Sequence, residues 1–204
     1  MGRNKQIKKR RDKRNQGTMR IIHREQRAQI KQSKQLMEYT GKIEQMLQDA
    51  QEYRLLCYRR MLLADMADKA DEKDDADYSV QDYLQERTEA SENAARLLDY
   101  IDIHKNELSP KEKSELLLTA FVALNTGFRN YEQSIRATEM SELLLPILPD
   151  SRTKLYLQVY LYQEIGDESM MEEIDRLMEM TYSEEDTEED RCLMNFYEQM
   201  MIEL

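Results

Sequence analysis

The stretch SPKEKSELLLTAFVALNTG, residues 109–127, contains a start signal, an apolar run and a stop signal for one helix. Ser109 is a favoured N-cap, the proline after it suits the first helical position, and the glutamate three residues after the cap can close a capping box. Residues 116–124 are nearly all apolar, and Gly127 then interrupts the pattern. We therefore predict an apolar helix that begins after Ser109 and ends near Gly127.

The amino-acid composition predicts helices for the rest of the chain as well. The 204 residues include only five Gly and three Pro, whereas Leu, Met, Glu, Gln, Lys and Arg are abundant. These last six side chains lose little rotamer freedom on a helix. Turn residues and β-branched runs, which mark strands, are few. We predict an all-α protein in which a long N-terminal helix with a basic arm is followed by antiparallel helical hairpins.

Two long helices are predicted upstream of residue 109. Almost nothing breaks the helical pattern over residues 19–76, so this segment is predicted to form one long helix. Its end, residues 65–77, holds seven acids and two lysines, which suits an exposed helix end and a loop. Apolar residues recur at helical spacing over residues 80–101, and this second helix should stop near Asn106.

Within residues 19–76, apolar residues alternate steps of three and four, as in the a and d positions of a heptad seam. The seam consists of Leu36, Tyr39, Ile43, Met46, Ala50, Tyr53 and Cys57. The seam either joins two chains in a homodimer or packs against the helix of residues 80–101 in its own chain. The short connection between these two helices favours the second alternative, an antiparallel hairpin.

Downstream of residue 109 the sequence shows an internal repeat. A shift of 39 residues places Pro110 on Pro149 and Gly127 on Gly166. Each unit consists of a proline, an apolar helix, a turn with glycine and a second helix. A period near 40 made of paired helices is typical of an α-solenoid. We predict a helical-repeat bundle with an acidic surface over residues 79–204.

The segment LYQEIGD, residues 161–167, resembles the end of the first helix of a tetratricopeptide repeat. The resemblance covers about residues 113–180, and it implies a concave surface for a peptide or partner helix, and no chemistry. The chain departs from that family in its period, which is about 34 residues in tetratricopeptide repeats. It also has Met170 and Met171 where the family usually has a small residue early in the second helix.

Charge divides the chain into two parts of opposite sign. Residues 1–35 hold thirteen Lys and Arg against two acids, a net charge of +11. Because the whole chain carries −11, the remaining 169 residues carry −22. Residues 1–18 are polar, basic and without periodicity, so we predict that this arm is disordered. Such asymmetry between segments indicates the kind of partner rather than the fold.

The basic arm is the strongest functional signal in the sequence. Over residues 3–34 it could contact the phosphates of RNA or DNA, act as a targeting signal, dock on an acidic protein, or be a solvated tail. It has no aromatic residue to stack on bases, so any nucleic-acid binding should be directed at the backbone and tolerant of sequence. The candidate phosphate-binding residues are Lys5, Lys8, Lys9, Arg10, Arg11, Lys13, Arg14, Arg20, Arg24 and Arg27.

The remaining residues with chemical potential indicate binding or packing rather than catalysis. We find no nucleophile elbow, phosphate loop or dinucleotide-binding turn, and neither His23 nor His104 has a cysteine or carboxylate at metal-ligand spacing. We therefore expect no enzymatic activity, metal or cofactor. Cys57 and Cys192 are expected to be buried thiols. The tyrosines of residues 155–162 either pack a central helix or line a groove for a partner, and they are Tyr156, Tyr160 and Tyr162.

Together these features predict a non-enzymatic helical adaptor. Its basic arm would bind a polyanion, and its acidic helical body would bind a protein partner. The alternatives are an assembly protein that uses the heptad seam and a peptide-sensing regulator of the tetratricopeptide type. The charged N-terminus is unlike a secretory signal, no apolar run is long enough to span a bilayer, and an intracellular location is expected.

Overall fold

The computed structural model describes residues 43–69, 80–181, 187, 189, 191 and 192, and the regular structure in this part of the chain is entirely helical. It comprises six α-helices and two short 3₁₀ helices. Their bounds are α2 Ile43–Lys69, α3 Val80–Ile103, α4 Pro110–Thr126, α5 Tyr131–Leu144, η1 Leu145–Ile147, α6 Arg152–Ile165, η2 Glu168–Met170 and α7 Met171–Thr181. The all-α prediction is confirmed for these residues.

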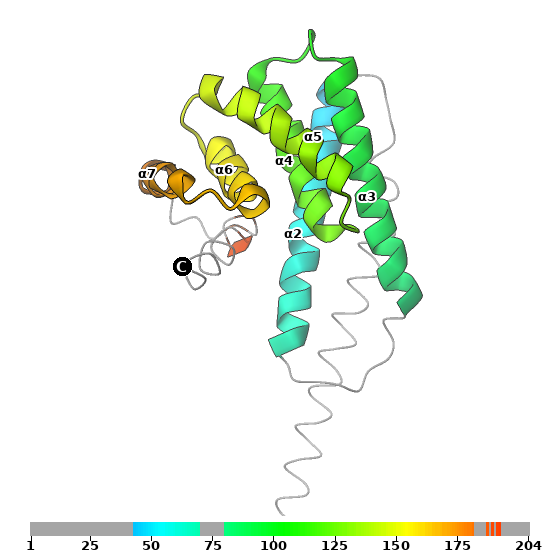
Figure 1. Cartoon of the computed structure of the whole chain (residues 1–204). Helices are drawn as coiled ribbons and strands as arrows, with labels where there is room; N and C mark the ends of the chain where they lie inside the picture. The colour runs from blue at the N-terminus through cyan, green and yellow to red at the C-terminus, as the bar shows by residue number, and fades with distance from the viewer. Residues whose placement is uncertain (1–42, 70–79, 182–186, 188, 190, 193–204) are drawn as a thin grey trace, which may run out of the picture.

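Helix α4 is the centre of the packing. It lies against α2, α3, α5 and α6, while α7 packs on α6 (Figure 1). The apolar run over residues 116–124 is buried along its whole length. A helix that is apolar on every side needs neighbours on every side. This is why α4 contacts four other helices.

The start of α4 confirms the predicted capping box. The Glu112 backbone N–H donates to Ser109 Oγ at 3.3 Å, and the Ser109 N–H donates back to Glu112 Oε2 at 2.7 Å. These two bonds satisfy two of the amides that a helix start leaves without an intrahelical acceptor. The helix ends at Thr126, as the sequence predicted.

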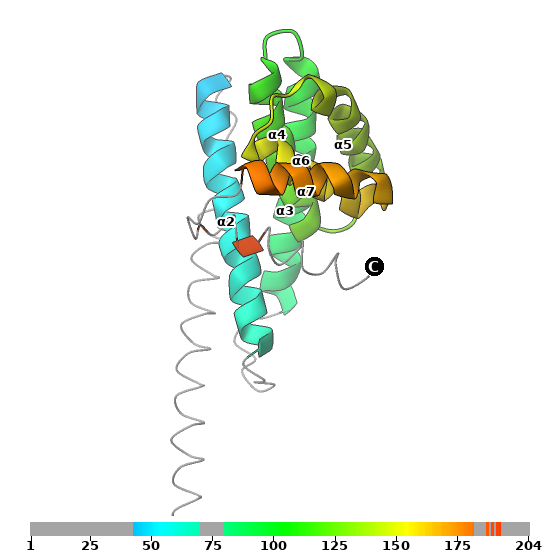
Figure 2. The same ribbon diagram turned by 90° about the vertical axis from the view of Figure 1, so that its left-hand side faces the viewer.

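The described members of the heptad seam face the core of their own chain. Met46, Ala50, Tyr53 and Cys57 are buried, and Ile43 packs against them from the edge. Their main neighbour is α4 rather than the predicted partner helix α3. Helices α2 and α4 run side by side in the same direction (Figure 2). Helix α3 also reaches α2, since Glu86 Oε1 on α3 lies 2.9 Å from Arg60 Nε on α2. The intramolecular alternative therefore describes these residues, with α4 rather than α3 as the main partner helix.

Register contacts between α2 and α4 support this arrangement. Thr119 Oγ1 donates to the Ala50 carbonyl at 3.4 Å, and Thr126 Oγ1 approaches Cys57 Sγ at 3.8 Å. Both pairs are 69 residues apart in sequence, so the two helices are parallel and keep a constant register. Leu36, Tyr39 and the remainder of the predicted helix 19–76 outside α2 lie outside the described residues, as does the predicted disordered arm 1–18.

Two glycines end helices for different physical reasons. Gly166 closes α6 with φ 69°, in the left-handed region that favours glycine. Gly127 closes α4 with φ −87°, where any residue is allowed. A Cβ at Gly127 would lie 2.7 Å from Ser91 Oγ and 2.9 Å from Ser91 N. Close approach to α3, not backbone conformation, requires the glycine there.

The last helices cover α4 from the side opposite α3. Residues 155–161 of α6 are all buried, and α7 contributes Ile174 and Leu177 to the core. Exposed acidic residues occupy the opposite face of α7, which is therefore amphipathic. Within the described ranges, no helix combines the length and the apolar character needed to cross a bilayer.

Candidate functional site

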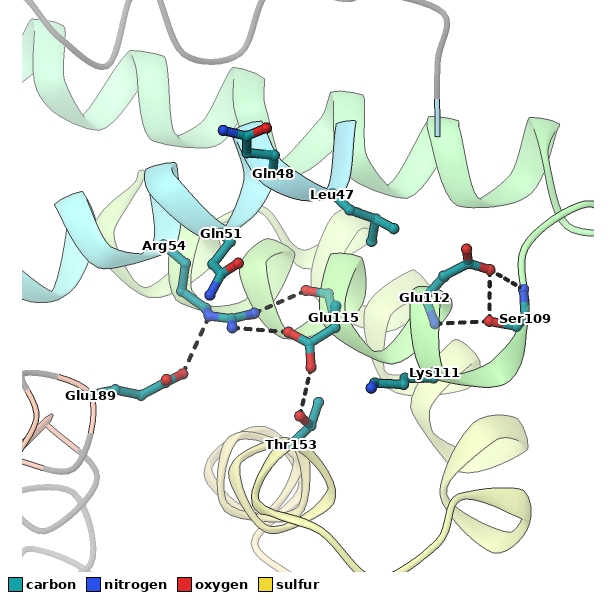
Figure 3. A pocket seen from close by; sticks show the side chains of 10 residues that line it. All are labelled: Leu47, Gln48, Gln51, Arg54, Ser109, Lys111, Glu112, Glu115, Thr153 and Glu189. Carbon is teal, nitrogen blue, oxygen red and sulfur yellow. Dashed lines mark hydrogen bonds and ion pairs between the residues drawn. The ribbon is translucent and has the colours of Figure 1, made fainter. Parts of the chain in front are cut away.

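A polar cleft of about 730 Å³ lies between the first half of α2 and the starts of α4 and α6 (Figure 3). Its volume falls in the range of small-molecule and peptide sites. The residues that line it are Leu47, Gln48, Gln51, Arg54, Ser109, Lys111, Glu112, Glu115, Thr153 and Glu189. The cleft therefore brings together four segments that are distant in sequence.

Arg54 is the central residue of the cleft, and its side chain is only 6% exposed. Its Nη2 lies 2.9 Å from Glu115 Oε2, and its Nη1 donates to the Glu115 carbonyl at 3.2 Å. Its Nε lies 3.3 Å from Glu189 Oε1. Figure 3 shows the guanidinium between these two carboxylates. One arginine thus connects α2, α4 and the C-terminal part of the chain.

The network continues from Glu115 into α6. Thr153 Oγ1 donates to Glu115 Oε1 at 2.7 Å, so both carboxylate oxygens of Glu115 are used. Burial on its own would lower the pKa of Arg54, but the neighbouring carboxylates Glu189 and Glu115 outweigh it, and the pKa is raised. The guanidinium therefore remains charged, and it cross-links the helices through the two carboxylates.

The rim of the cleft is formed by the capping box of α4. The side-chain and backbone hydrogen bonds from Ser109 lower the pKa of the Glu112 carboxyl. Next to it Lys111 is exposed and projects from the first turn of α4. Positive charge at this rim adds to the positive end of the helix dipole.

Several polar side chains of the cleft are engaged in contacts between or at the ends of helices. Arg54, Glu115 and Thr153 use their polar atoms on one another, and Ser109 and Glu112 are committed to the cap. Among the residues that the structure describes, no group of His, Cys, Asp and Glu side chains is arranged to hold a metal ion.

Sequence reasoning did not single out Arg54 or Glu115. A signal was nevertheless present, because Arg54 stands between Tyr53 and two leucines in an apolar stretch of α2. A charged residue in such a stretch needs a partner once it is buried. The partner could not be found from the sequence, since Glu115 is 61 residues away.

The predicted tyrosine row lies mostly in the core. Tyr156 and Tyr160 are 2% and 1% exposed, and the Tyr160 ring is stacked on Phe121 of α4 with centroids 6.1 Å apart. Burial raises the pKa of the Tyr160 hydroxyl far above its usual value. Tyr162 is partly buried against the core. Central-helix packing therefore describes Tyr156 and Tyr160, and a partner could reach them only by opening the core.

The two cysteines are buried free thiols, as predicted. They lie in the same part of the core, where Cys192 Sγ approaches the Tyr58 carbonyl at 3.7 Å and Cys57 is the neighbour of Tyr58 in sequence. Burial raises the pKa of the Cys57 thiol. His104 follows the end of α3, and its Nδ1 lies 2.9 Å from Glu107 Oε2.

The ten predicted phosphate-binding residues of the arm, from Lys5 to Arg27, lie outside the described residues. Comparisons of the chain with protein-family models, with curated proteins and with solved structures find no match.

Proposed function

We propose that this protein is a non-enzymatic helical adaptor whose basic arm binds nucleic acid while its acidic helical body binds a protein partner. One observation carries the proposal, namely the separation of +11 on residues 1–35 from −22 on the remaining residues. A polyanion attracts the first part and is repelled by the second. The arm is therefore the part of the chain that suits phosphate binding.

The exposed charges of the body support the proposal that the body binds a protein and the arm binds nucleic acid. Where burial is described, over residues 43–62 and 81–181, fifteen acidic side chains are exposed against six basic ones. Most of the acids lie on α3, α5 and α7 and on the connections between helices. Such a surface favours a partner with basic or apolar groups over a polyanion.

We further propose that α4 with α5 and α6 with α7 are two copies of one helical-hairpin unit. Each first helix packs on its second helix, and α4 also packs on α6. Each unit starts with a serine N-cap, Ser109 or Ser151, and has Gly127 or Gly166 after its first helix. This arrangement is compatible with the tetratricopeptide-like reading of the sequence and with a surface for a partner.

Salt dependence tests the nucleic-acid part of the proposal. If about six to eight bases of the arm reach phosphates, log K should fall against log salt with a slope of roughly −4 to −7, the smaller value for single strands. Affinity should fall about 10²- to 10⁴-fold between 50 and 200 mM salt. Fluorescence anisotropy with labelled RNA and DNA oligonucleotides measures both quantities.

Two variants locate the binding site. Deletion of residues 1–34 should abolish binding and leave the helical circular-dichroism signal of the body largely intact. Substitution of Lys8, Lys9, Arg10 and Arg11 by Ala should reduce the salt slope by about 3 to 4. As a control, Arg96→Ala with Lys105→Ala removes exposed positive charge from the body and should change the slope little. Retained binding after the deletion, or affinity that is indifferent to salt, would show that the arm serves another partner.

A further inference from the structure

Three aromatic side chains are exposed together where the start of α3 meets the α4–α5 turn. Tyr83, Phe128 and Tyr131 are 44%, 40% and 68% exposed. The Arg87 guanidinium lies 5.3 Å from the Tyr83 ring centroid and 5.2 Å from that of Phe128. The Arg129 guanidinium lies 5.0 Å from the Tyr131 ring centroid. We call these five residues the aromatic–arginine surface.

Hydrogen bonds hold this surface in place. Arg87 donates from Nε and Nη2 to the Gly127 carbonyl at 3.0 and 2.6 Å, and from Nη1 to the Tyr83 hydroxyl. The Phe128 N–H donates to Ser91 Oγ at 2.8 Å. The turn is therefore fastened to α3, beside which it lies in Figure 1. A ligand that binds such a preorganised surface loses little affinity to ordering it.

The surface also differs in charge from the rest of the body. Arg54, Arg60, Arg136 and Arg176 each pair with a carboxylate. In contrast, the exposed Arg129 has no carboxylate within ion-pair distance among the described residues.

Two carboxylates of α3 that are close in sequence to Tyr83 and Arg87 have other partners. Glu86 Oε1 lies 2.9 Å from Arg60 Nε, and Glu89 Oε1 accepts from Gln85 at 3.2 Å. Glu132, in the first turn of α5, remains exposed. The aromatic–arginine surface thus includes the exposed Arg129 guanidinium, on a body whose exposed charge is mostly acidic.

We propose that the aromatic–arginine surface stacks the unpaired bases of a single-stranded nucleic acid that the basic arm holds by its phosphates. This inference deepens the proposed function and rests on it. The arm has no aromatic residue over positions 1–35, so it can attract a strand but cannot stack on its bases. Exposed rings and arginine planes supply that contact, and a duplex cannot use it because its bases are already stacked.

The distances are compatible with one strand touching both places. Cys57 is level with Thr126 at the end of α4, so the turn lies fourteen residues along α2 from Ile43, or about 21 Å at 1.5 Å per residue. A short oligonucleotide that is held near the start of α2 can therefore also contact the turn.

The test compares a single strand with the duplex of the same sequence. Tyr131→Ala combined with Phe128→Ala should weaken binding of a labelled 20-nucleotide single strand about 10- to 100-fold, in keeping with the loss of one or two stacked bases. Duplex affinity and the salt slope should stay unchanged, because the phosphate contacts are untouched. Tyr131→Phe keeps a ring and should bind like the wild type. Leu143→Ala, on the same helix and 79% exposed, is the matched control.

Stability is checked first by thermal melts, because Phe128 contributes to the turn. If the double variant melts early, Tyr131→Ala alone is used, since its ring is mainly in solvent, with a smaller expected loss of about tenfold. Unchanged single-strand affinity in a folded variant, or an equal loss of affinity for the duplex, would contradict the proposal that this surface stacks unpaired bases. The exposed rings would then serve another partner. That result would not affect the proposal that the arm binds nucleic acid. Binding that survives deletion of residues 1–34 would contradict that proposal instead.

Discussion

Arg54 is a charged residue that is buried in the core. Its guanidinium forms ion pairs with Glu115 and Glu189 and donates to the Glu115 carbonyl. A buried ion pair adds little net stability over a well-packed apolar substitute, but removing one partner leaves the other charge uncompensated. The position is therefore intolerant of substitution even though the pair itself contributes modestly.

Arg54→Met should lower the free energy of unfolding by about 2 to 4 kcal/mol, below the upper range for broken buried pairs. The lower values are expected because the Glu115 side chain is 28% exposed and keeps some contact with water. Arg59→Met, at the exposed neighbouring face of α2, should change it by less than about 0.5 kcal/mol. Urea unfolding of both variants measures the difference, and equal losses would mean that the buried network is not the cause.

The thiols provide a second prediction at this scale. Cys57 and Cys192 are 0% and 3% exposed, and burial raises the pKa of Cys57. Since the thiolate is the reactive form, native protein at pH 8 should react slowly with a thiol-specific disulfide reagent. Denatured protein should react at both sites at once. Rapid labelling of either thiol in the native state would contradict the packing around Tyr58.

Among the helices, the N-terminal caps of α4 and α6 can be compared directly, because both are serines. Both helices start with serine, but α4 has Glu112 at the third position and α6 has Lys154 there. Only the first cap is therefore coupled to a carboxylate. Each serine accepts a backbone N–H, at 3.3 Å in both cases.

Ser109→Ala should cost about 1 kcal/mol of stability at pH 7. Because Ser109 lowers the pKa of Glu112 in the folded state, that part of the stabilisation is present above the unfolded pKa of about 4.3 and is lost as the pH falls through the folded pKa. The difference between wild type and Ser109→Ala should therefore shrink in acid. Ser151→Ala is the control, and its cost should stay constant over the same pH range. Thermal melts between pH 7 and pH 3 measure both.

The two helix-ending glycines should respond differently to substitution. Gly166→Ala should cost about 1 kcal/mol, because only the left-handed conformation opposes it and nothing lies within 4 Å of the added Cβ. Gly166→Asn should recover part of this loss, since asparagine tolerates that region. Gly127→Ala should cost more, because its Cβ would collide with the Ser91 backbone. Chemical denaturation ranks the three variants, and a reversed order would refute the close approach to α3.

In the molecule as a whole, the described residues near the C-terminus pack back onto α2. Cys192 is part of the core and contacts Tyr58, which is 134 residues earlier in the chain. Glu189 pairs with Arg54 from the same end. These contacts join segments that could otherwise separate without disturbing α3, α4 and α5.

Glu189→Gln combined with Cys192→Ser should lower the free energy of unfolding by about 1 to 3 kcal/mol, since it weakens an ion pair and puts a more polar hydroxyl where a buried thiol packs. Glu179→Gln, an exposed substitution on α7, should be nearly neutral. In the double variant, amide hydrogen exchange should become faster mainly in α2, because Arg54 and Tyr58 of this helix make the two contacts. An increase confined to α7 would contradict the linkage to α2.

Features that depend on near neighbours along the chain could be predicted from the order of the residues. The capping box at Ser109, the end of α4 at Gly127 and the helix over residues 80–103 arise from hydrogen bonds and rotamer preferences within one or two turns. The opposite charges of the arm and the body are also fully contained in the residue order.

Which surfaces pack against one another could not be predicted from the sequence and became clear from the folded chain. The seam of α2 was apolar at the right spacing for α3, for a second chain or for α4, and burial of apolar area is non-directional, so periodicity could not choose among them. For the same reason, the sequence did not show which residue pairs with Arg54, or that Tyr156 and Tyr160 are buried. The tertiary structure resolved these choices because α4, apolar on every side, could bury its surface only by taking α2, α3, α5 and α6 as neighbours at once.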